Sequence, residues 1–503
     1  SRFEHVLVDE FQDTNHAQAR LATMLAGKTR NIFVVGDADQ GIYAFRGATI
    51  KNLLDFERDW PEAHVITLEQ NYRSSQNILS AANAVIEHNA MRKPKSLWTE
   101  SAAGELITRY HAQNEHDEAL FVAEEIDRLG GMGYSLTDVA VFYRTNAQSR
   151  VLEEIFSKQD IPYRVVGGVR FYERKEIKDL IAWLRGATNP NDSVSIMRAA
   201  QAPRRGIGDT TLAKLAEFAR QNQIALGEAF ERAEEAPGLT KRALKGVLEA
   251  ARLFARIRLA DADRSVADII EMTWEITGYM EELQAERTFE SLSRQENLRE
   301  LAGVAREYDE TADDPGLTNF LEGIALITDT DEQAGEEGGV TFMTLHNAKG
   351  LEFPVVFIVG MEDGVFPHLR SLGDPDQLEE ERRLCYVGIT RARERLYLLN
   401  AWSRSLWGGT NYNPASRFLN EIPEELVALA GEKKGASGPG RALPKHDPGI
   451  FKVGQEVEHD RWGRGTIVEI ARSAVGMEAT IFFPDVGEKR LDLSLAPIKP
   501  AGG

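Results

Sequence analysis

The chain has 503 residues, and its 59 Lys and Arg stand against 79 Asp and Glu, a formal net charge of −20. This length predicts about three or four domains and excludes a small single-domain binding module. The negative charge argues, on electrostatics alone, against a polyanionic partner. With 42% hydrophobic residues and no apolar run near the ~18 residues of a membrane helix, the composition argues against disorder and against a membrane protein. The single cysteine, Cys385, cannot form an internal disulfide, which fits a cytoplasmic location.

Two short apolar runs open the chain, and each stops at acidic residues. Residues 6–8 are followed by Asp9 and Glu10, and residues 32–35 are followed by Gly36 and Asp37. Such runs predict strands of a parallel sheet that is covered on both faces. In open α/β sheets ligands bind beyond the carboxyl ends of the strands, which is where both acidic clusters fall.

A second α/β set follows, interrupted by a region without strand signals. Strands are predicted at 65–68, 139–144, 163–166, 340–343, 355–359 and 396–399. From about 169 to 335 apolar residues recur at helical spacing, which predicts a helical insertion. A Gly-rich stretch near 431–440 predicts a flexible linker, and glycine-spaced β-rich runs over 451–499 predict a small β-barrel.

The acidic pair and the segment after the second strand suggest chemistry. A carboxylate at Asp9 can hold Mg²⁺ through its water shell, while its neighbour Glu10 can orient and deprotonate an attacking water. Gln40 can read a γ-phosphate, and Tyr43 and Phe45 can stack on bases at ~1–3 kcal/mol per base. Taken singly, the pair is more typical of the start of a solvated loop, and the two rings are more typical of a hydrophobic core.

Three more segments gain meaning only in combination. Residues 70–75 place an aromatic beside a cation, 344–353 form a polar glycine-containing turn, and 380–393 form an amphipathic helix that ends in arginines. In this order and at these separations, the segments 9–14, 40–48, 71–74, 344–353 and 386–392 resemble the motifs of the UvrD/PcrA/Rep family of superfamily 1 DNA helicases. The resemblance spans almost the whole chain.

The resemblance implies an α/β fold of tandem RecA-like parallel-sheet motor domains, the first one incomplete, with a helical insertion and a C-terminal Tudor-like β-barrel. The implied boundaries are 1–63 for the first motor domain, 64–168 and 336–425 for the two halves of the second, 169–335 for the insertion, 426–449 for the linker and 450–503 for the barrel. The implied activity is ATP-dependent unwinding of duplex DNA, 3′ to 5′, in repair or replication.

The resemblance also implies roles at the nucleotide, with ATP and Mg²⁺ as cofactors. Asp9 would coordinate Mg²⁺, Glu10 would activate the hydrolytic water and Gln40 would sense the γ-phosphate. Tyr72 would stack on adenine, Gly350 would lie at the nucleotide and Glu352 would contact the ribose. Arg73 and Arg391 would act as arginine fingers. Arginine fingers are worth ~10³-fold or more in rate.

Contacts with DNA follow in the same way. Tyr43, Phe45 and Arg46 would line a single-strand track, and Thr344 and His346 would contact the DNA backbone. Phe45 stands where the family often has Trp. The glycine turn at Gly206 and Gly208 would touch duplex DNA at a junction, although its residues are as typical of an ordinary helix cap.

The C-terminal residues resemble the Tudor-like tail of the UvrD and PcrA branch, which docks on RNA polymerase. Trp462 in this tail is either a contact residue or a core ring, and other partners would be repair or replication proteins.

One expected motif is absent from the sequence. No Gly-x-x-x-x-Gly-Lys-Ser/Thr phosphate loop occurs in it, and the chain begins at Ser1. We therefore expect a fragment whose phosphate loop lies upstream and which is catalytically inactive alone, because ATP binds poorly without that loop. The alternative is a non-catalytic docking module that binds duplex DNA and RNA polymerase.

Overall fold

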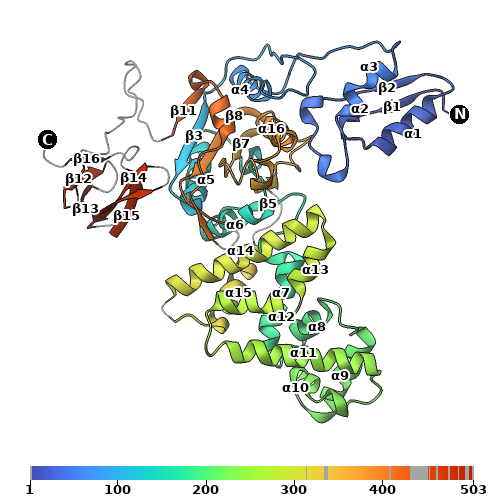
Figure 1. Ribbon diagram of the computed structural model, residues 1–503, viewed down its shortest axis with the longest axis vertical. Coiled ribbons are helices and arrows are strands. Elements are labelled where there is room, and N and C mark those ends of the chain that lie inside the picture. The colour runs from blue at the N-terminus through green and yellow to red at the C-terminus, as the bar shows by residue number, and fades with distance from the viewer. Residues whose placement is uncertain are drawn as a thin grey trace. The chain divides into compact units, whose positions relative to one another are not determined.

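The computed structural model describes residues 3–312, 314–333, 338–406, 409–430, 451–452, 454–459, 463–473, 476–484, 487–492 and 498–500. The chain divides into two compact units, residues 1–431 and 432–503, and each is considered by itself (Figure 1). Most of the predicted linker lies outside the described residues, as does Trp462, for which the sequence leaves both a contact role and a core position open. No helix in the described part of the chain is long and apolar enough to cross a membrane.

The first unit begins with two parallel strands. β1 (Val6–Val8) pairs with β2 (Ile32–Val34), and α1 (His16–Ala26) connects them. The prediction of strands here is confirmed, but the prediction that both faces are covered is wrong, because Leu7 is 72% exposed and Phe33 is 60% exposed. Within the described residues the two strands form a sheet of their own, so alternate side chains on one face have nothing packed over them.

A seven-stranded parallel sheet forms the centre of this unit. Its order is β11-β3-β8-β7-β4-β6-β5. The strands are β3 (Ile107–Ala112), β4 (Val139–Tyr143), β5 (Tyr163–Val165), β6 (Val340–Thr344), β7 (Phe353–Ile358), β8 (Ala392–Ala401) and β11 (Val427–Leu429). One face packs against α4 (Gln76–Ile86) and α16 (Pro375–Ile389), and the other against α5 (Glu115–Gly130) and α6 (Ser149–Lys158).

One strand prediction fails in this sheet, and two of its strands, β3 and β11, were not predicted. Residues 65–68 do not form a strand; Val65, Ile66 and Leu68 are exposed there, and the neighbouring ladder contact is a single bridge from Gln70 to Trp98. The strand β3 was not predicted, because its sequence ITRYHA mixes polar and apolar residues. The strands predicted from 139 onward are present, with bounds shifted by a few residues.

Nine α-helices lie between β5 and β6 in the described chain, coloured green to yellow in Figure 1. They are α7 (Lys175–Thr188), α8 (Ser193–Gln201), α9 (Asp209–Asn222), α10 (Leu226–Glu231), α11 (Lys241–Ala260), α12 (Val266–Ile276), α13 (Tyr279–Glu286), α14 (Phe289–Thr311) and α15 (Leu317–Gln333). A hydrophobic core of their own surrounds the buried Trp183 and Phe230. The helical insertion is therefore a separately packed body in the middle of the sheet sequence.

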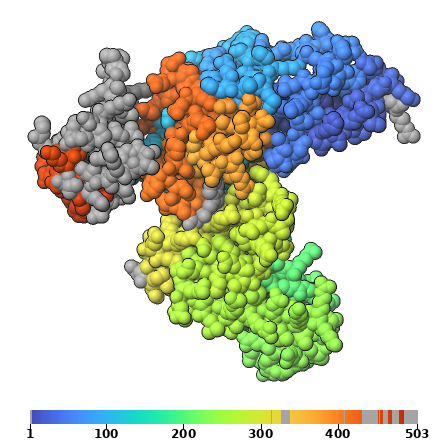
Figure 2. Space-filling model, viewed as in Figure 1, coloured from blue at the N-terminus to red at the C-terminus, as the bar shows by residue number. Residues whose placement is uncertain are grey.

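The N-terminal segment contacts the C-terminal half of the sheet sequence. In the space-filling view the blue N-terminal residues lie directly against the orange residues (Figure 2). The backbone N–H of Ala44 donates to Glu380 Oε1 on α16 at 2.9 Å, and Tyr43 donates to the carbonyl of His346 at 3.3 Å. These contacts bring the ends of β1 and β2 close to the loop after β6.

The second unit contains a five-stranded antiparallel sheet in the order β15-β14-β13-β12-β16. The strands are β12 (Glu456–His459), β13 (Gly463–Ser473), β14 (Gly476–Phe483), β15 (Gly487–Asp492) and β16 (Ile498–Pro500). Val457, Ile467, Ile481 and Phe483 are fully buried and form its core. The chain thus combines a large parallel sheet, many helices and a small C-terminal β-domain.

Candidate functional site

The acidic residues after β1 are tied to the end of β2 by one buried side chain. Gln12 is fully buried in the turn η1 (Phe11–Asp13); its amide donates to Glu10 Oε2, and its oxygen accepts from the backbone N–H of Asp37 at 2.9 Å. Glu10 itself adopts a left-handed conformation with φ of 49°. This conformation turns the chain sharply at the strand end and presents Asp9 and Glu10 at the sheet edge.

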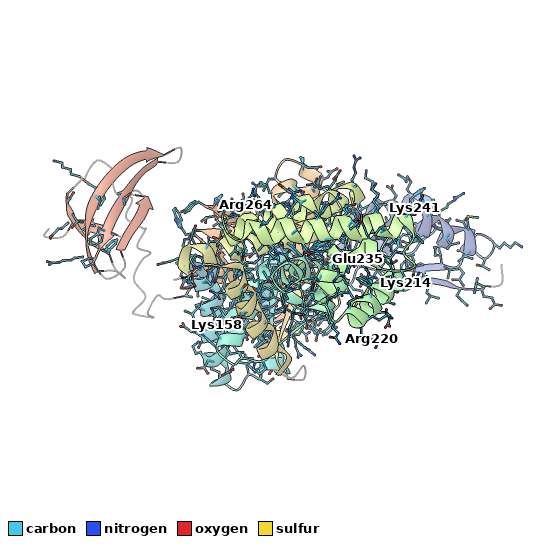
Figure 3. All side chains as sticks on the ribbon, turned by 90° about the horizontal axis from the view of Figure 1, so that it is seen from below. Lys158, Lys214, Arg220, Glu235, Lys241 and Arg264 are labelled. Atoms are coloured by element: carbon cyan, nitrogen blue, oxygen red, sulfur yellow. The ribbon has the colours of Figure 1, made fainter. Side chains whose placement is uncertain are left out.

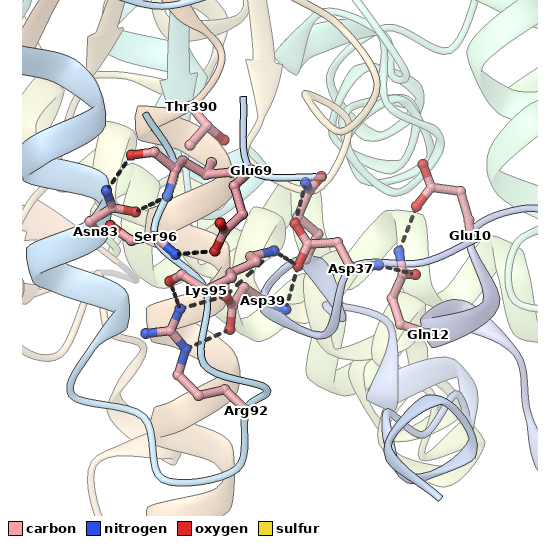
Figure 4. A network of polar contacts seen from close by, with 12 residues as sticks. Glu10, Gln12, Asp37, Asp39, Glu69, Asn83, Arg92, Lys95, Ser96 and Thr390 are labelled. Carbon is pink, nitrogen blue, oxygen red and sulfur yellow. Dashed lines mark hydrogen bonds and ion pairs between the residues drawn. The ribbon is translucent and has the colours of Figure 1, made fainter. Parts of the chain in front are cut away.

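Gln40 is held in place by Asp37. Asp37 in turn contacts Lys95, a basic residue far along the chain (Figure 4). Gln40 lies in the turn η2 (Ala38–Gln40) and donates from Nε2 to Asp37 Oδ2 at 2.8 Å. Lys95 forms an ion pair with the other oxygen of Asp37. The Gln40 side chain therefore has a defined orientation rather than a free surface position.

A second carboxylate in this turn is almost fully buried. Asp39 is 1% exposed, and Arg92 contacts it with two nitrogens, the closer at 2.9 Å. Burial raises the pKa of Asp39, and the nearby Lys95 and Arg92 oppose that rise. Arg92 and Lys95 were not predicted from the sequence; the available signal was a pair of aspartates after an apolar run, which require cationic partners when they are buried.

Lys349, in the loop after β6, reaches into the acidic cluster of the N-terminal segment. Its ammonium forms an ion pair with Asp13, donates to the carbonyl of Gln40 at 2.8 Å and lies 3.5 Å from Glu10 Oε2. The Lys349 side chain is only 7% exposed. Burial raises the pKa of Asp13, and the bond with Lys349 opposes this. Sequence analysis gave Lys349 no role, because a lysine in a polar turn is typical of a solvated surface.

The two predicted arginine fingers lie near each other and near Glu352. Arg73 Nε donates to Glu352 Oε2, which lowers the pKa of Glu352, and Arg73 Nη1 donates to the carbonyl of Thr390 at 3.4 Å. Arg391 is 2% exposed and donates to the carbonyls of Val387 and Leu351 at 3.1 and 3.2 Å. Burial, followed by the charge of Arg73, lowers the pKa of Arg391 to about 10. A cation that is buried among neutral acceptors favours an incoming anion.

The remaining predicted nucleotide residues lie at the surface. Tyr72 is 82% exposed, and its hydroxyl donates to Gln70 at 2.8 Å, so one face of its ring is available for stacking. Gly350 has φ of +85° and no atom within 4 Å of the position that a Cβ would take. Only glycine adopts this conformation readily, which keeps the backbone beside Lys349 open to a ligand.

These donors suit a magnesium–polyphosphate complex. Among the described residues no group of three or more His, Cys, Asp or Glu gathers around a possible metal position. Mg²⁺ at nucleotide sites is typically held by one or two carboxylates, with phosphates and waters completing its shell, so the exposed Asp9 beside Glu10 is a sufficient protein contribution. Arg73, Arg391 and Lys349 supply the positive charge that phosphates require.

A loose variant of the phosphate loop occurs at residues 22–29, with Ala22 in place of the first glycine and then Gly27, Lys28 and Thr29. The structure excludes it as a phosphate loop. Gly27 follows the last turn of α1, and Lys28 and Thr29 are exposed. A phosphate loop precedes a helix so that free N–H groups point at the phosphate, whereas the end of a helix presents carbonyls.

An aromatic cluster lies next to the acidic cluster. Tyr43 and Phe45 have ring centroids 5.9 Å apart, Phe45 and His346 are 5.3 Å apart edge to face, and the Arg46 guanidinium lies 5.4 Å from the Phe45 ring. Phe289 on α14 joins them, with its ring 4.5 Å from Phe45. Sequence analysis did not identify Phe289, because it lies in a helical region far from any motif.

His346 contributes a ring rather than a charge to this cluster. Burial, with the nearby Arg144 and Arg46, lowers the pKa of His346 well below its ordinary value, so the imidazole is neutral near pH 7. Thr344, at the end of β6, is half-buried and accepts from the backbone N–H of Asn347 with its carbonyl at 3.0 Å. The loop that carries both residues also carries Lys349.

The glycine turn of the insertion lies on a different element from these clusters. Gly206 has φ of +76°, and the carbonyl of Gly208 accepts the first backbone bond of α9, from Thr211 at 2.9 Å. Both glycines are exposed. Lys214, Arg220 and Lys241 on α9 and α11 are exposed (Figure 3); Lys214 donates to the carbonyl of Gly238, and Arg220, in the last turn of α9, is paired with Glu217. An exposed turn at a helix start suits a phosphate backbone.

Comparison with known proteins covers nearly the whole chain. Residues 1–61 match the UvrD/REP helicase N-terminal domain, residues 66–402 the UvrD-like helicase C-terminal domain and residues 453–500 the PcrA/UvrD tudor domain.

Curated relatives agree with these family matches. ATP-dependent DNA helicase UvrD1 of Mycobacterium tuberculosis is 48% identical over an alignment 539 residues long. The alignment covers 99% of this chain and 70% of the relative. ATP-dependent DNA helicases PcrA of Staphylococcus epidermidis and Bacillus subtilis are each 44% identical, over 99% of this chain and 70% and 71% of their own lengths. The chain belongs to the UvrD/PcrA-type helicase family.

Proposed function

We propose that the chain forms the core of an ATP-dependent DNA helicase that moves 3′ to 5′ along a single strand. The observation that carries this proposal is the loop after β6. Its Lys349 contacts the acidic cluster with Asp13 and Gln40, and its His346 contacts the aromatic cluster with Phe45. One loop of the second sheet therefore touches both candidate sites, so a shift caused at one is felt at the other.

At the nucleotide the positions of the side chains support the following roles. When bound, Mg²⁺-ATP supplies the free energy and a phosphoryl group whose charge must be stabilised in the transition state. Asp9 would hold the cation, and Glu10 would orient the attacking water and accept its proton. Gln40, fixed by Asp37, contacts the γ-phosphate side, and Arg73 and Arg391 stabilise the developing negative charge. Tyr72 stacks on the base, with Gly350 and Glu352 beside the sugar.

On the DNA side, Tyr43 and Phe45 stack on bases and Arg46 contacts the backbone. Stacking accepts any base, because every base has a π-face, and this suits a translocating enzyme. Thr344 and the neutral His346 offer a hydroxyl and a ring nitrogen to the sugar-phosphate chain. Gly206 and Gly208 contact the duplex ahead of the junction.

We further propose that the 503-residue chain alone hydrolyses little ATP, because its sequence has no phosphate loop to cradle the phosphates. ATP hydrolysis by the purified chain, with and without oligo-dT, tests this. We expect no stimulation by DNA. Strong stimulation would contradict the proposal.

The helicase assignment is tested in a chimera that carries the phosphate-loop region of one of the relatives ahead of Ser1. We expect it to unwind a duplex with a 3′ single-stranded tail but not one with a 5′ tail. Glu10→Gln should abolish unwinding, whereas Glu87→Gln, at an exposed position after α4, should leave it unchanged. Unwinding from the 5′ tail, no unwinding at all, or an active Glu10→Gln variant would contradict the assignment.

For the C-terminal β-domain we propose RNA polymerase as the partner, supported by the match to the PcrA/UvrD tudor domain. Phe482 on β14 is 45% exposed, whereas its neighbours Ile481 and Phe483 are buried in the core. Phe482→Ala should weaken retention of the chain on immobilised RNA polymerase without unfolding the β-domain. Equal retention of the variant, or none of the wild type, would contradict this partner.

A further inference from the structure

The ring of Phe289 lies against the ring that is proposed to stack on DNA. The centroids of Phe289 and Phe45 are 4.5 Å apart, and their planes are inclined by 33°. Phe289 also lies 6.3 Å from His346, so it is part of the same cluster. The two phenylalanines come from different bodies, Phe45 from the N-terminal segment and Phe289 from the first residue of α14 in the helical insertion.

At this separation the two rings leave no room for a base between them. Aromatic carbons in contact are about 3.5 Å apart, so a base between two rings requires the rings to be about 7 Å apart. The other neighbours of Phe45 are the Arg46 guanidinium at 5.4 Å, the edge-on His346 ring at 5.3 Å and the Tyr43 ring at 5.9 Å, inclined by 56°. Phe289 therefore takes the place on Phe45 that a stacked base would take.

Phe289 stands at a capped helix start. Thr288 caps α14, with its hydroxyl accepting from the N–H of Ser291 at 3.0 Å and the Ser291 hydroxyl accepting from the N–H of Thr288 at 3.1 Å. Farther along α14, Glu300 forms a buried ion pair with Arg150 on α6 at 2.9 Å. The position of Phe289 thus depends on how α14 is seated against the sheet.

We propose that Phe289 occupies the base-stacking face of Phe45 when no strand is bound, so that single-stranded DNA and the helical insertion compete for the same ring. This inference rests on the proposed role of Phe45 in the single-strand track. It assigns to the insertion a contact with the track that is separate from its glycine turn. A bound strand displaces Phe289, and this displacement moves α14 or rotates its first turn.

Single-strand binding by the 503-residue chain tests the competition directly. Fluorescence anisotropy of a labelled oligo-dT is measured for the wild type, Phe289→Ala, Phe289→Leu, Phe45→Ala and the double variant Phe45→Ala/Phe289→Ala. We expect Phe289→Ala to bind about three- to tenfold more tightly than the wild type, because one aromatic pair no longer opposes the strand. In the Phe45→Ala background the same change should have no effect, since the contested ring is gone.

The controls separate this mechanism from a general loosening of the insertion. Leu259→Ala removes an apolar side chain that is 73% exposed on α11 and should leave binding unchanged. Thermal unfolding of each variant shows that it is folded, and Phe289→Leu keeps an apolar residue but removes the flat ring, so it should gain affinity as well.

Each outcome decides between the two proposals. Weaker or unchanged binding by Phe289→Ala, with Phe45→Ala weakened, overturns the competition but leaves the single-strand track in place. A gain by Phe289→Ala that persists without Phe45 also overturns it. If the wild type does not bind oligo-dT, or if Phe45→Ala binds as tightly as the wild type, the proposed track fails and the inference fails with it.

Discussion

Lys349 is one of the residues that connect the N-terminal segment to the second sheet. Its ammonium contacts Asp13, Glu10 and the carbonyl of Gln40, and its side chain is 7% exposed. Removing one partner of a buried ion pair leaves the other charge uncompensated. The resulting loss of folding stability is larger than the stability that the pair itself contributes.

We expect Lys349→Met to lower the free energy of unfolding by about 1–3 kcal/mol. Scanning calorimetry measures the change, with the exposed Lys28→Met as the matched control. The double variant Lys349→Met/Asp13→Asn should recover part of the loss, because the stranded carboxylate is removed as well. A Lys349→Met variant as stable as Lys28→Met would show that the ion pair is not structural.

His346 makes stability depend on pH in a definite direction. Its pKa in the folded chain lies well below the ordinary value of 6.5, because of burial and two nearby arginines. As the pH falls below about 6.5 the unfolded chain binds a proton at this residue that the folded chain does not, so acid lowers the free energy of unfolding. Above that pH neither state binds the proton and the effect vanishes.

The melting temperature of the wild type should therefore fall more between pH 7 and about pH 5.5 than that of His346→Gln. His64→Gln, at an exposed position, should keep the wild-type pH dependence. Parallel curves for wild type and His346→Gln would contradict the assignment of a neutral, buried imidazole.

At the scale of elements, α16 is the helix that joins the two candidate sites to the sheet. Glu380 on it accepts from the N–H of Ala44 beside the aromatic cluster, and Arg391 follows its last turn. Cys385 lies on the buried side of the same helix, and burial raises the pKa of its thiol. A thiol that is buried and protonated reacts slowly with alkylating reagents.

We expect Cys385 to resist iodoacetamide at pH 8 in the native chain and to react completely in urea, as measured by intact mass. Ala44→Pro removes the N–H that Glu380 accepts and should speed the reaction if α16 depends on that contact. Rapid alkylation of the native wild type would show that α16 opens from the sheet.

The elements that the sequence predicted well are those with a continuous apolar run. Residues 340–343 and 355–359 read as buried strands, and β6 and β7 are central strands of the sheet. Residues 65–68 have the same local character but lie exposed, because strand formation requires a partner and the sequence does not show one. β3 pairs with β11 on one side and β8 on the other, although its polar and apolar residues do not alternate regularly.

The candidate site was predictable where residues act within one motif. Asp9, Glu10, Gln40, Tyr43 and Phe45 stand in short segments whose order is distinctive. Contacts between distant segments were not predictable. Lys95 meets Asp37 across 58 residues, Lys349 meets Asp13 across 336, and Phe289 meets Phe45 across 244. Only the folded chain places such partners together.

At the scale of the whole molecule, a chain of net charge −20 is proposed to hold a polyanion. The conflict is resolved locally, because the proposed track is made of rings, one arginine and a neutral histidine rather than of a broad basic surface. Stacking contributes ~1–3 kcal/mol per base to the binding free energy and requires no net charge on the protein. It also opposes each translocation step less than many ion pairs to the strand would.

The most direct test of this account compares single-strand binding by the wild-type chain and by Phe45→Ala, measured by anisotropy of a labelled oligo-dT at fixed salt. The account predicts that the wild type binds and that Phe45→Ala binds about 5- to 100-fold more weakly, the loss of one base stack. Equal binding by the two proteins, or binding of blunt duplex in preference to the single strand, would contradict it.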